Sequence, residues 1–237
     1  MLSTLIKNML RTISEAISHF FQNVLKRIEE WSQRARQLDE DNTSRIEYQS
    51  EQEEAKYRPE KVDVILGLQC KEYLTEVFPD GIAAKVQNMS NENLLELFQM
   101  IEKEAERIMD VHVDDVDFYS TTEEPYCNYG GYYQPADNTF HINMTPVYSG
   151  NPYCIEYEIY AIFHELKHAR QWAAVKGREC GGKDYGYSDR QLDEWQQNML
   201  NYITMEENDE LYMKQPLEMD SRGFESIVSG ERKYEVI

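Results

Sequence analysis

The feature that most constrains this chain is a His-Glu-x-x-His motif, His164–His168, inside a segment with the pattern of a helix. Residues four apart on an α-helix lie one turn apart on the same face, so His164 and His168 can direct their imidazoles to one metal ion. Glu165 lies beside His164, close enough to hydrogen bond a water at that metal. Two imidazole ligands with an adjacent carboxylate base are typical of zinc peptidases.

The flanks of the motif indicate that this helix is buried. Buried imidazoles need polar partners or a metal. The alternative to a metal site is a pair of core histidines satisfied by hydrogen bonds, which would give the adjacent Glu165 no role. We therefore expect Zn²⁺ as the cofactor. The apolar flanking residues are Ile159, Ile162, Phe163, Leu166, Ala169 and Ala173.

The composition excludes several classes of partner. The chain has 237 residues and a formal net charge of −20, so nucleic-acid phosphate is not an expected partner. No apolar run approaches the roughly 20 residues of a membrane span, and no apolar secretion signal opens the chain. The four cysteines are far apart and form no Cys-x-x-Cys pair, which predicts reduced thiols in a cytoplasmic protein.

Two regions are expected. Apolar residues recur at alternating spacings of three and four between Leu10 and Leu38, close to a heptad pattern. We expect 1–58 to form a long helical arm or coiled coil, through which copies of the chain could self-associate; a membrane-surface helix is the alternative. Residues 59–237 are expected to form a zincin-like metallopeptidase domain.

The second region is predicted to have an α+β fold, with helices packed on a small sheet or hairpin. A hairpin directly before the metal helix could pair its free backbone groups with an extended peptide substrate. Gly177 is expected to end the metal helix, and the glycine-rich 177–187 to form a loop. The expected helices are 59–78, 82–87, 91–109, 155–175, 189–205 and 216–230, and the expected strands are 111–119, 130–133 and 139–144.

A catalytic zinc usually takes three protein ligands. Gln171 and Ala174 stand where the His-Glu-x-x-His-x-x-Gly-x-x-His class has glycine and histidine, so that class is excluded. We choose Glu218, in the first turn of the helix that begins at Pro216, with Asp220 as the next choice. The two lie about 200° apart on a helix, so both cannot face one metal. Further candidates are Cys154, Cys180 and His141.

The segments His164–Ala169 and Pro216–Phe224 resemble the compact glutamate-zincins of the ImmA/IrrE type. They are also similar to related His-Glu-x-x-His proteins of mobile elements and phages. That family shares His-Glu-x-x-His-Ala and a downstream Glu-x-acidic-Ala-x-x-Phe helix, preceded by a hairpin. The resemblance covers about 90–230 and implies a zinc-binding α+β fold with Glu218 as third ligand and Glu165 as general base. Ser221 stands where alanine is usual, and the gap between His168 and Glu218 holds an extra helix.

The expected activity is hydrolysis of peptide bonds in a protein substrate by zinc-activated water, with Glu165 as the proton carrier. Asp220 is expected to orient a ligand imidazole if it is not itself a ligand. The alternative function is a catalytically silent zincin-fold module that binds or inhibits a partner protein. Candidate donors to the transition state are Tyr185, Tyr187, Tyr212 and His141.

Overall fold

Helix α6, Pro152–Cys180, is the longest element of the described chain, and its neighbours pack around it. The computed structural model describes residues 59–121, 123 and 130–231. These belong to one compact unit, Tyr57–Ile237. The predicted helical arm, 1–58, lies outside the described residues.

The ends of α6 follow from local sequence. The Asn151 side chain accepts a hydrogen bond from the Tyr153 N–H, and Pro152 occupies the first helical turn. The prediction that Gly177 ends the helix is wrong, because the left-handed residue is Gly181 (φ 65°). Gly177 instead allows the following loop to approach: a Cβ there would lie 2.5 Å from the carbonyl oxygen of Lys183.

A three-stranded sheet has the order β1-β3-β2, with β1 Asp115–Tyr119, β2 Gly131–Gln134 and β3 Thr139–Asn143. β2 and β3 are antiparallel, which confirms the predicted hairpin, and β1 runs parallel to β3. The strand expected at 111–119 is shorter than predicted. The Val113 N–H donates to Glu106 Oε1 at 2.7 Å rather than to a neighbouring strand.

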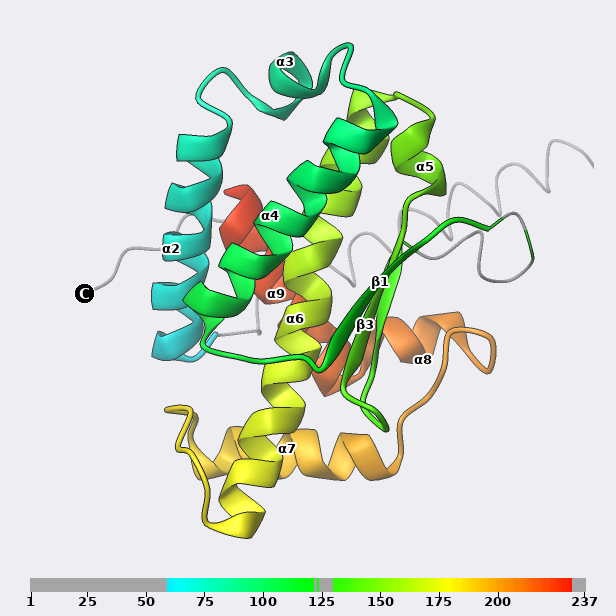
Figure 1. The fold of residues 1–237 in the computed structure, drawn as a ribbon. Helices are drawn as coiled ribbons and strands as arrows, with labels where there is room; N and C mark the ends of the chain where they lie inside the picture. The colour runs from blue at the N-terminus through cyan, green and yellow to red at the C-terminus, as the bar shows by residue number, and fades with distance from the viewer. Residues whose placement is uncertain (1–58, 122, 124–129, 232–237) are drawn as a thin grey trace, which may run out of the picture. The chain divides into compact units, whose positions relative to one another are not determined.

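Helices and sheet form an α+β structure around a main apolar core, and a second, smaller apolar cluster includes Trp195 and Leu217 (Figure 1). α4, Asn91–Met109, and α9, Pro216–Ser229, both pack on α6, and α2, Lys61–Val77, packs on α4 and α9. In Figure 1 the sheet lies on the other side of α6 from α2. The largest wholly buried apolar side chains of this core include Phe98, Phe140, Phe163 and Phe224.

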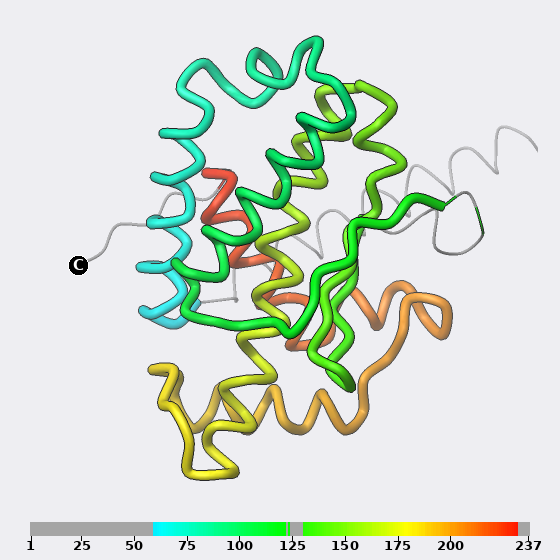
Figure 2. The backbone as a smooth tube through the Cα atoms, in the orientation of Figure 1, coloured from blue at the N-terminus to red at the C-terminus, as the bar shows by residue number. Residues whose placement is uncertain are grey.

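Between α6 and α9 the chain makes an excursion that Figure 2 shows as a yellow-to-orange path. α7, Asp189–Leu200, begins at the predicted cap Ser188, whose Oγ accepts from the Gln191 N–H. It ends five residues earlier than predicted. An unpredicted short helix, α8 Asp209–Lys214, follows, capped by Asn208. The expected short helix 82–87 is confirmed as α3, Ile82–Val86, and α5, Thr145–Tyr148, was not predicted.

Candidate metal centre

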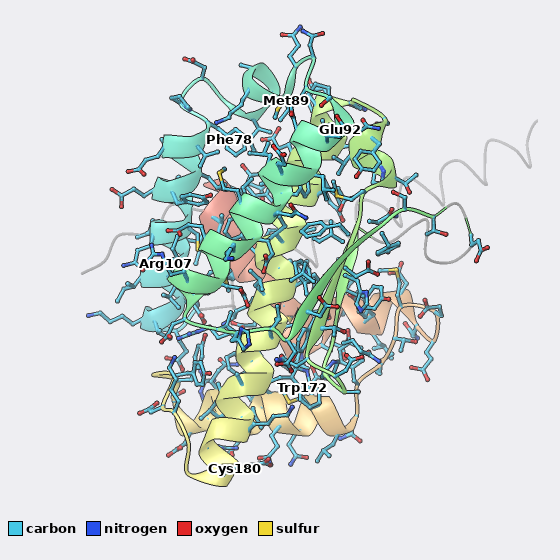
Figure 3. The ribbon with its side chains drawn as sticks, viewed as in Figure 1. Phe78, Met89, Glu92, Arg107, Trp172 and Cys180 are labelled. Atoms are coloured by element: carbon cyan, nitrogen blue, oxygen red, sulfur yellow. The ribbon has the colours of Figure 1, made fainter. Side chains whose placement is uncertain are left out.

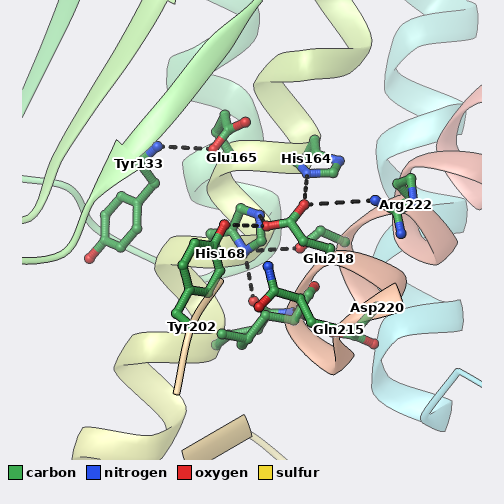
Figure 4. A network of polar contacts seen from close by, with 12 residues as sticks. Tyr133, His164, Glu165, His168, Tyr202, Gln215, Glu218, Asp220 and Arg222 are labelled. Carbon is green, nitrogen blue, oxygen red and sulfur yellow. Dashed lines mark hydrogen bonds and ion pairs between the residues drawn. The ribbon is translucent and has the colours of Figure 1, made fainter. Parts of the chain in front are cut away.

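The packing of α6 on α9 brings together His164, His168 and Glu218 (Figure 4). The two imidazole rings lie 5.0 Å apart between centroids and are nearly perpendicular. His164 Nε2 is 3.4 Å from Glu218 Oε2, and His168 Nε2 is 3.2 Å from Glu218 Oε1. The side chain of Glu218 is 1% exposed. This His-His-Glu group could hold a metal ion.

The two imidazoles contact different oxygens of Glu218, and the possible ligand atoms of the three residues lie within 4.8 Å of one another. Ligand atoms bonded to a tetrahedral zinc at roughly 2.0–2.2 Å lie about 3.3–3.6 Å from one another. The two contacts between an imidazole nitrogen and a Glu218 oxygen are 3.4 and 3.2 Å. Glu218 Oε2 is also buried and accepts no hydrogen bond within the described residues. A cation between the three side chains would satisfy that oxygen.

The two imidazoles and Glu218 shift the pKa values of one another. Burial alone would lower the pKa of His164, but its contacts with Glu218 and Glu225 raise that pKa to about 10. The pKa of His168 is also raised, because Glu218 outweighs the effect of burial. Burial would raise the pKa of Glu218, yet the two imidazoles hold it well below its usual value. A bound metal would replace the imidazolium protons as the partner of the carboxylate.

The outer nitrogen of each imidazole has its own partner, and sequence reasoning missed both. Glu225 Oε2 lies 3.1 Å from His164 Nδ1, and Gln171 Oε1 lies 2.9 Å from His168 Nδ1. Such contacts fix the ring orientation of a metal-ligating histidine. Helical spacing is the signal that could have found them, since Gln171 follows His168 by three residues and Glu225 follows Glu218 by seven.

The predicted base, Glu165, is held beside the sheet. Its Oε2 accepts a hydrogen bond of 2.9 Å from the backbone N–H of Tyr133 on β2 (Figure 4). Because this N–H points to Glu165, Tyr133 presents its backbone to the outer edge of β2 and not to β3. Burial raises the pKa of Glu165, opposed by the neighbouring His164 and His168. The base and the sheet edge therefore lie beside the same turn of α6.

Tyr202, which was not predicted as a site residue, contacts the His164–His168–Glu218 group. Tyr202, in the segment between α7 and α8, donates its hydroxyl to Glu218 Oε1 at 2.7 Å. Gln215 fixes the neighbouring Ile203 by bonding both its N–H and its carbonyl. The predicted donor Tyr212 packs edge-on against Tyr202, and burial together with the nearby charge of Glu218 raises the pKa of its hydroxyl.

The other three predicted donors make their contacts elsewhere. The Tyr187 hydroxyl donates to the buried Asp63, and the Tyr185 ring lies over the guanidinium of Arg170. His141 stacks on Tyr132, and its ring contacts Thr139 and Asp117. These positions follow from the packing of α2 and the sheet, which the local sequence does not specify.

The alternative ligands also lie away from the group. Asp220 pairs with Lys167, on another face of α9 from Glu218, as their 200° separation predicts. Cys154 is ten residues before His164 on α6, about 15 Å away along the helix. Cys180 is twelve residues after His168, about 18 Å away, at the exposed end of α6 (Figure 3). The described cysteines, Cys70, Cys154 and Cys180, are all free thiols.

Comparisons with protein-family models, with curated proteins and with solved structures found no match. Among the described residues, no helix is long and apolar enough to cross a membrane.

Proposed function

We propose that this protein is a zinc-dependent peptidase of the glutamate-zincin type that hydrolyses peptide bonds in a protein substrate. The observation that carries the proposal is the His164–His168–Glu218 group, whose ligand atoms lie close enough together to hold a metal ion, with Glu165 beside it. A zincin-like architecture, and a helical arm at 1–58, are parts of the same proposal. The resemblance to the ImmA/IrrE type supports it through the residues of α6 and α9.

The cofactor and the base have separate tasks. When bound, zinc lowers the pKa of water towards 7 and polarises a carbonyl group. Glu165 accepts a proton from the attacking water and delivers it to the leaving amine. Its burial favours this role, because a raised pKa brings a carboxylate closer to the range in which it can exchange protons at neutral pH.

Two neighbouring features suit the remaining steps. The Tyr212 hydroxyl, on the ring that packs against Tyr202, is the candidate donor to the oxyanion of the substrate, because the single proton of the Tyr202 hydroxyl is already donated to Glu218 Oε1. The outer edge of β2 has backbone groups that can pair with an extended peptide next to Glu165. A protein substrate entering as an added strand would thus lie beside the base.

Elemental analysis combined with a cleavage assay tests the proposal. We expect about one zinc per chain in the wild type and in Glu165→Gln, and loss of zinc in His164→Ala and Glu218→Ala. His112→Ala is the matched control, because this histidine is 79% exposed and lies outside the cluster. Activity is measured by mass spectrometry of a peptide library, and Glu165→Gln should abolish cleavage.

Absence of zinc from folded wild-type protein that has met zinc and no chelator would refute the metal centre. Zinc in the wild type with no cleavage of any peptide, and an unchanged biological effect of Glu165→Gln, would instead favour the binding-module alternative.

A further inference from the structure

Lys167, the fourth residue of the His-Glu-x-x-His motif, points away from the two histidines into the protein. Its ammonium is fully buried and lies 2.6 Å from Asp63 Oδ1 and 2.9 Å from Asp220 Oδ2. The rings of Tyr187, Trp195 and Phe224 surround it at 4.6–5.8 Å. Two carboxylates, one from α2 and one from α9, are therefore the ion-pair partners of this buried ammonium. Lys167 in turn fixes the position of Asp220.

Asp220 in turn fixes the orientation of the Gln171 side-chain amide. The same oxygen, Asp220 Oδ2, accepts a hydrogen bond of 2.7 Å from Gln171 Nε2. The other hydrogen of that amide goes to the carbonyl oxygen of Leu217 at 3.1 Å. An ionised carboxylate and a backbone carbonyl can only accept hydrogen bonds. The NH₂ group of Gln171 must therefore face Asp220 and Leu217, and its oxygen must face the other way.

The orientation of the Gln171 amide determines which nitrogen of His168 carries the proton. Gln171 Oε1, 2.9 Å from His168 Nδ1, is an acceptor, so Nδ1 must carry a proton. The free electron pair of the neutral ring is then on Nε2, the nitrogen that faces Glu218. Ser221 Oγ also lies 3.2 Å from Nδ1, but a hydroxyl can donate or accept and does not by itself select the protonated nitrogen.

We propose that Lys167, Asp220 and Gln171 form a buried hydrogen-bond relay that fixes the proton of His168 on Nδ1 and so presents Nε2 to the metal. All three are positioning residues, and Asp63 anchors the relay from α2. The inference rests on the metal centre of the proposed function and does not require peptide hydrolysis. It assigns a role to two residues, Lys167 and Gln171, that the zinc-peptidase motif leaves unspecified.

Zinc affinity is the first test, measured by competition with a chromophoric chelator. Gln171→Met keeps the length of the side chain but removes its fixed oxygen, and we expect about 10- to 100-fold weaker zinc binding. Ser221→Ala is the matched control, because it removes the other contact to the same nitrogen, and we expect a smaller loss. Urea unfolding of both metal-free variants shows whether the fold is retained.

The second readout needs no metal. In ¹⁵N-labelled, metal-free protein at a pH high enough for the His168 ring to be neutral, we expect Nε2 to be bare and the Nδ1 proton to give a slowly exchanging NMR signal. In Gln171→Met that proton should exchange faster. The five histidines of the chain make the assignment tractable. A bare Nδ1 in the wild type would overturn the relay, as would a folded Gln171→Met with unchanged zinc affinity and unchanged exchange. If the wild type bound no zinc, the metal centre would fail, while the NMR result would still decide the relay.

Discussion

A second buried acid on α6 makes a sharp prediction about stability. Glu158 lies two turns before Glu165 on the same face of the helix and is 3% exposed. Its Oε2 has no hydrogen-bond partner within the described residues and faces the backbone at Gly130. Burial, with a smaller contribution from the charge of Glu165, raises the pKa of Glu158 from its usual 4.5 to about 8.

The sign of the effect follows from linkage. A carboxyl group with a raised pKa in the folded state contributes stability below the pKa of the unfolded chain, and that stability is lost as the pH rises through the folded pKa. For a shift from 4.5 to about 8, the loss between about pH 5.5 and about pH 7.5 is roughly 2.5 kcal/mol. Glu158→Gln removes the titrating group and should remove this loss.

The assay is urea unfolding of wild type and Glu158→Gln at the two pH values, in the presence of a chelator. The free energy of unfolding of the variant should gain roughly 2.5 kcal/mol relative to wild type on going to the higher pH. A constant cost of placing an amide at this position cancels in that comparison. Glu156→Gln, on the same helix, controls for the change in net charge. The reasoning would be refuted if the difference in the free energy of unfolding between variant and wild type were the same at both pH values.

Two further predictions concern the supports of the site. Lys167→Met should destabilise the protein by about 3–5 kcal/mol, because it leaves the buried Asp63 and Asp220 without their cation; a loss no greater than that of the exposed Lys176→Met in urea unfolding would contradict this. Gly67→Ala should lower the Tm, since a Cβ there would lie 2.8 Å from Ile227 Cγ2 and overpacking costs about 1–3 kcal/mol; an unchanged or higher Tm would show that α2 and α9 can move apart freely.

Local sequence was sufficient to predict the features that depend on one element. Helical geometry alone places His164 and His168 on the same face of their helix. Ser188 and Pro216 mark the starts of two other helices by their own chemistry. Helix geometry also predicted that Glu218 and Asp220 could not both face the histidines, because residues two apart point in different directions. The structure places Glu218 at the histidines and Asp220 at Lys167.

Features that depend on how two elements pack could not be predicted. Gly177 has the sequence of a helix end, yet the helix continues because the loop after it packs against that glycine. The sequence led us to expect Tyr187, and not Tyr202, near the metal group. Only the packed structure shows that the first belongs to the buried Lys167 network and the second to Glu218.

The charges between α6 and α9 also determine how these two helices align. Glu218 faces His164 and His168, Asp220 faces Lys167, and Glu225 contacts His164. Sliding α9 by one residue would leave Glu218 and Asp220 buried without partners, at a cost of several kcal/mol for each. Apolar packing alone tolerates more variation than this. The same pairs that assemble the candidate metal centre therefore hold its helices in register, so the geometry of the centre and the stability of the core cannot be changed independently.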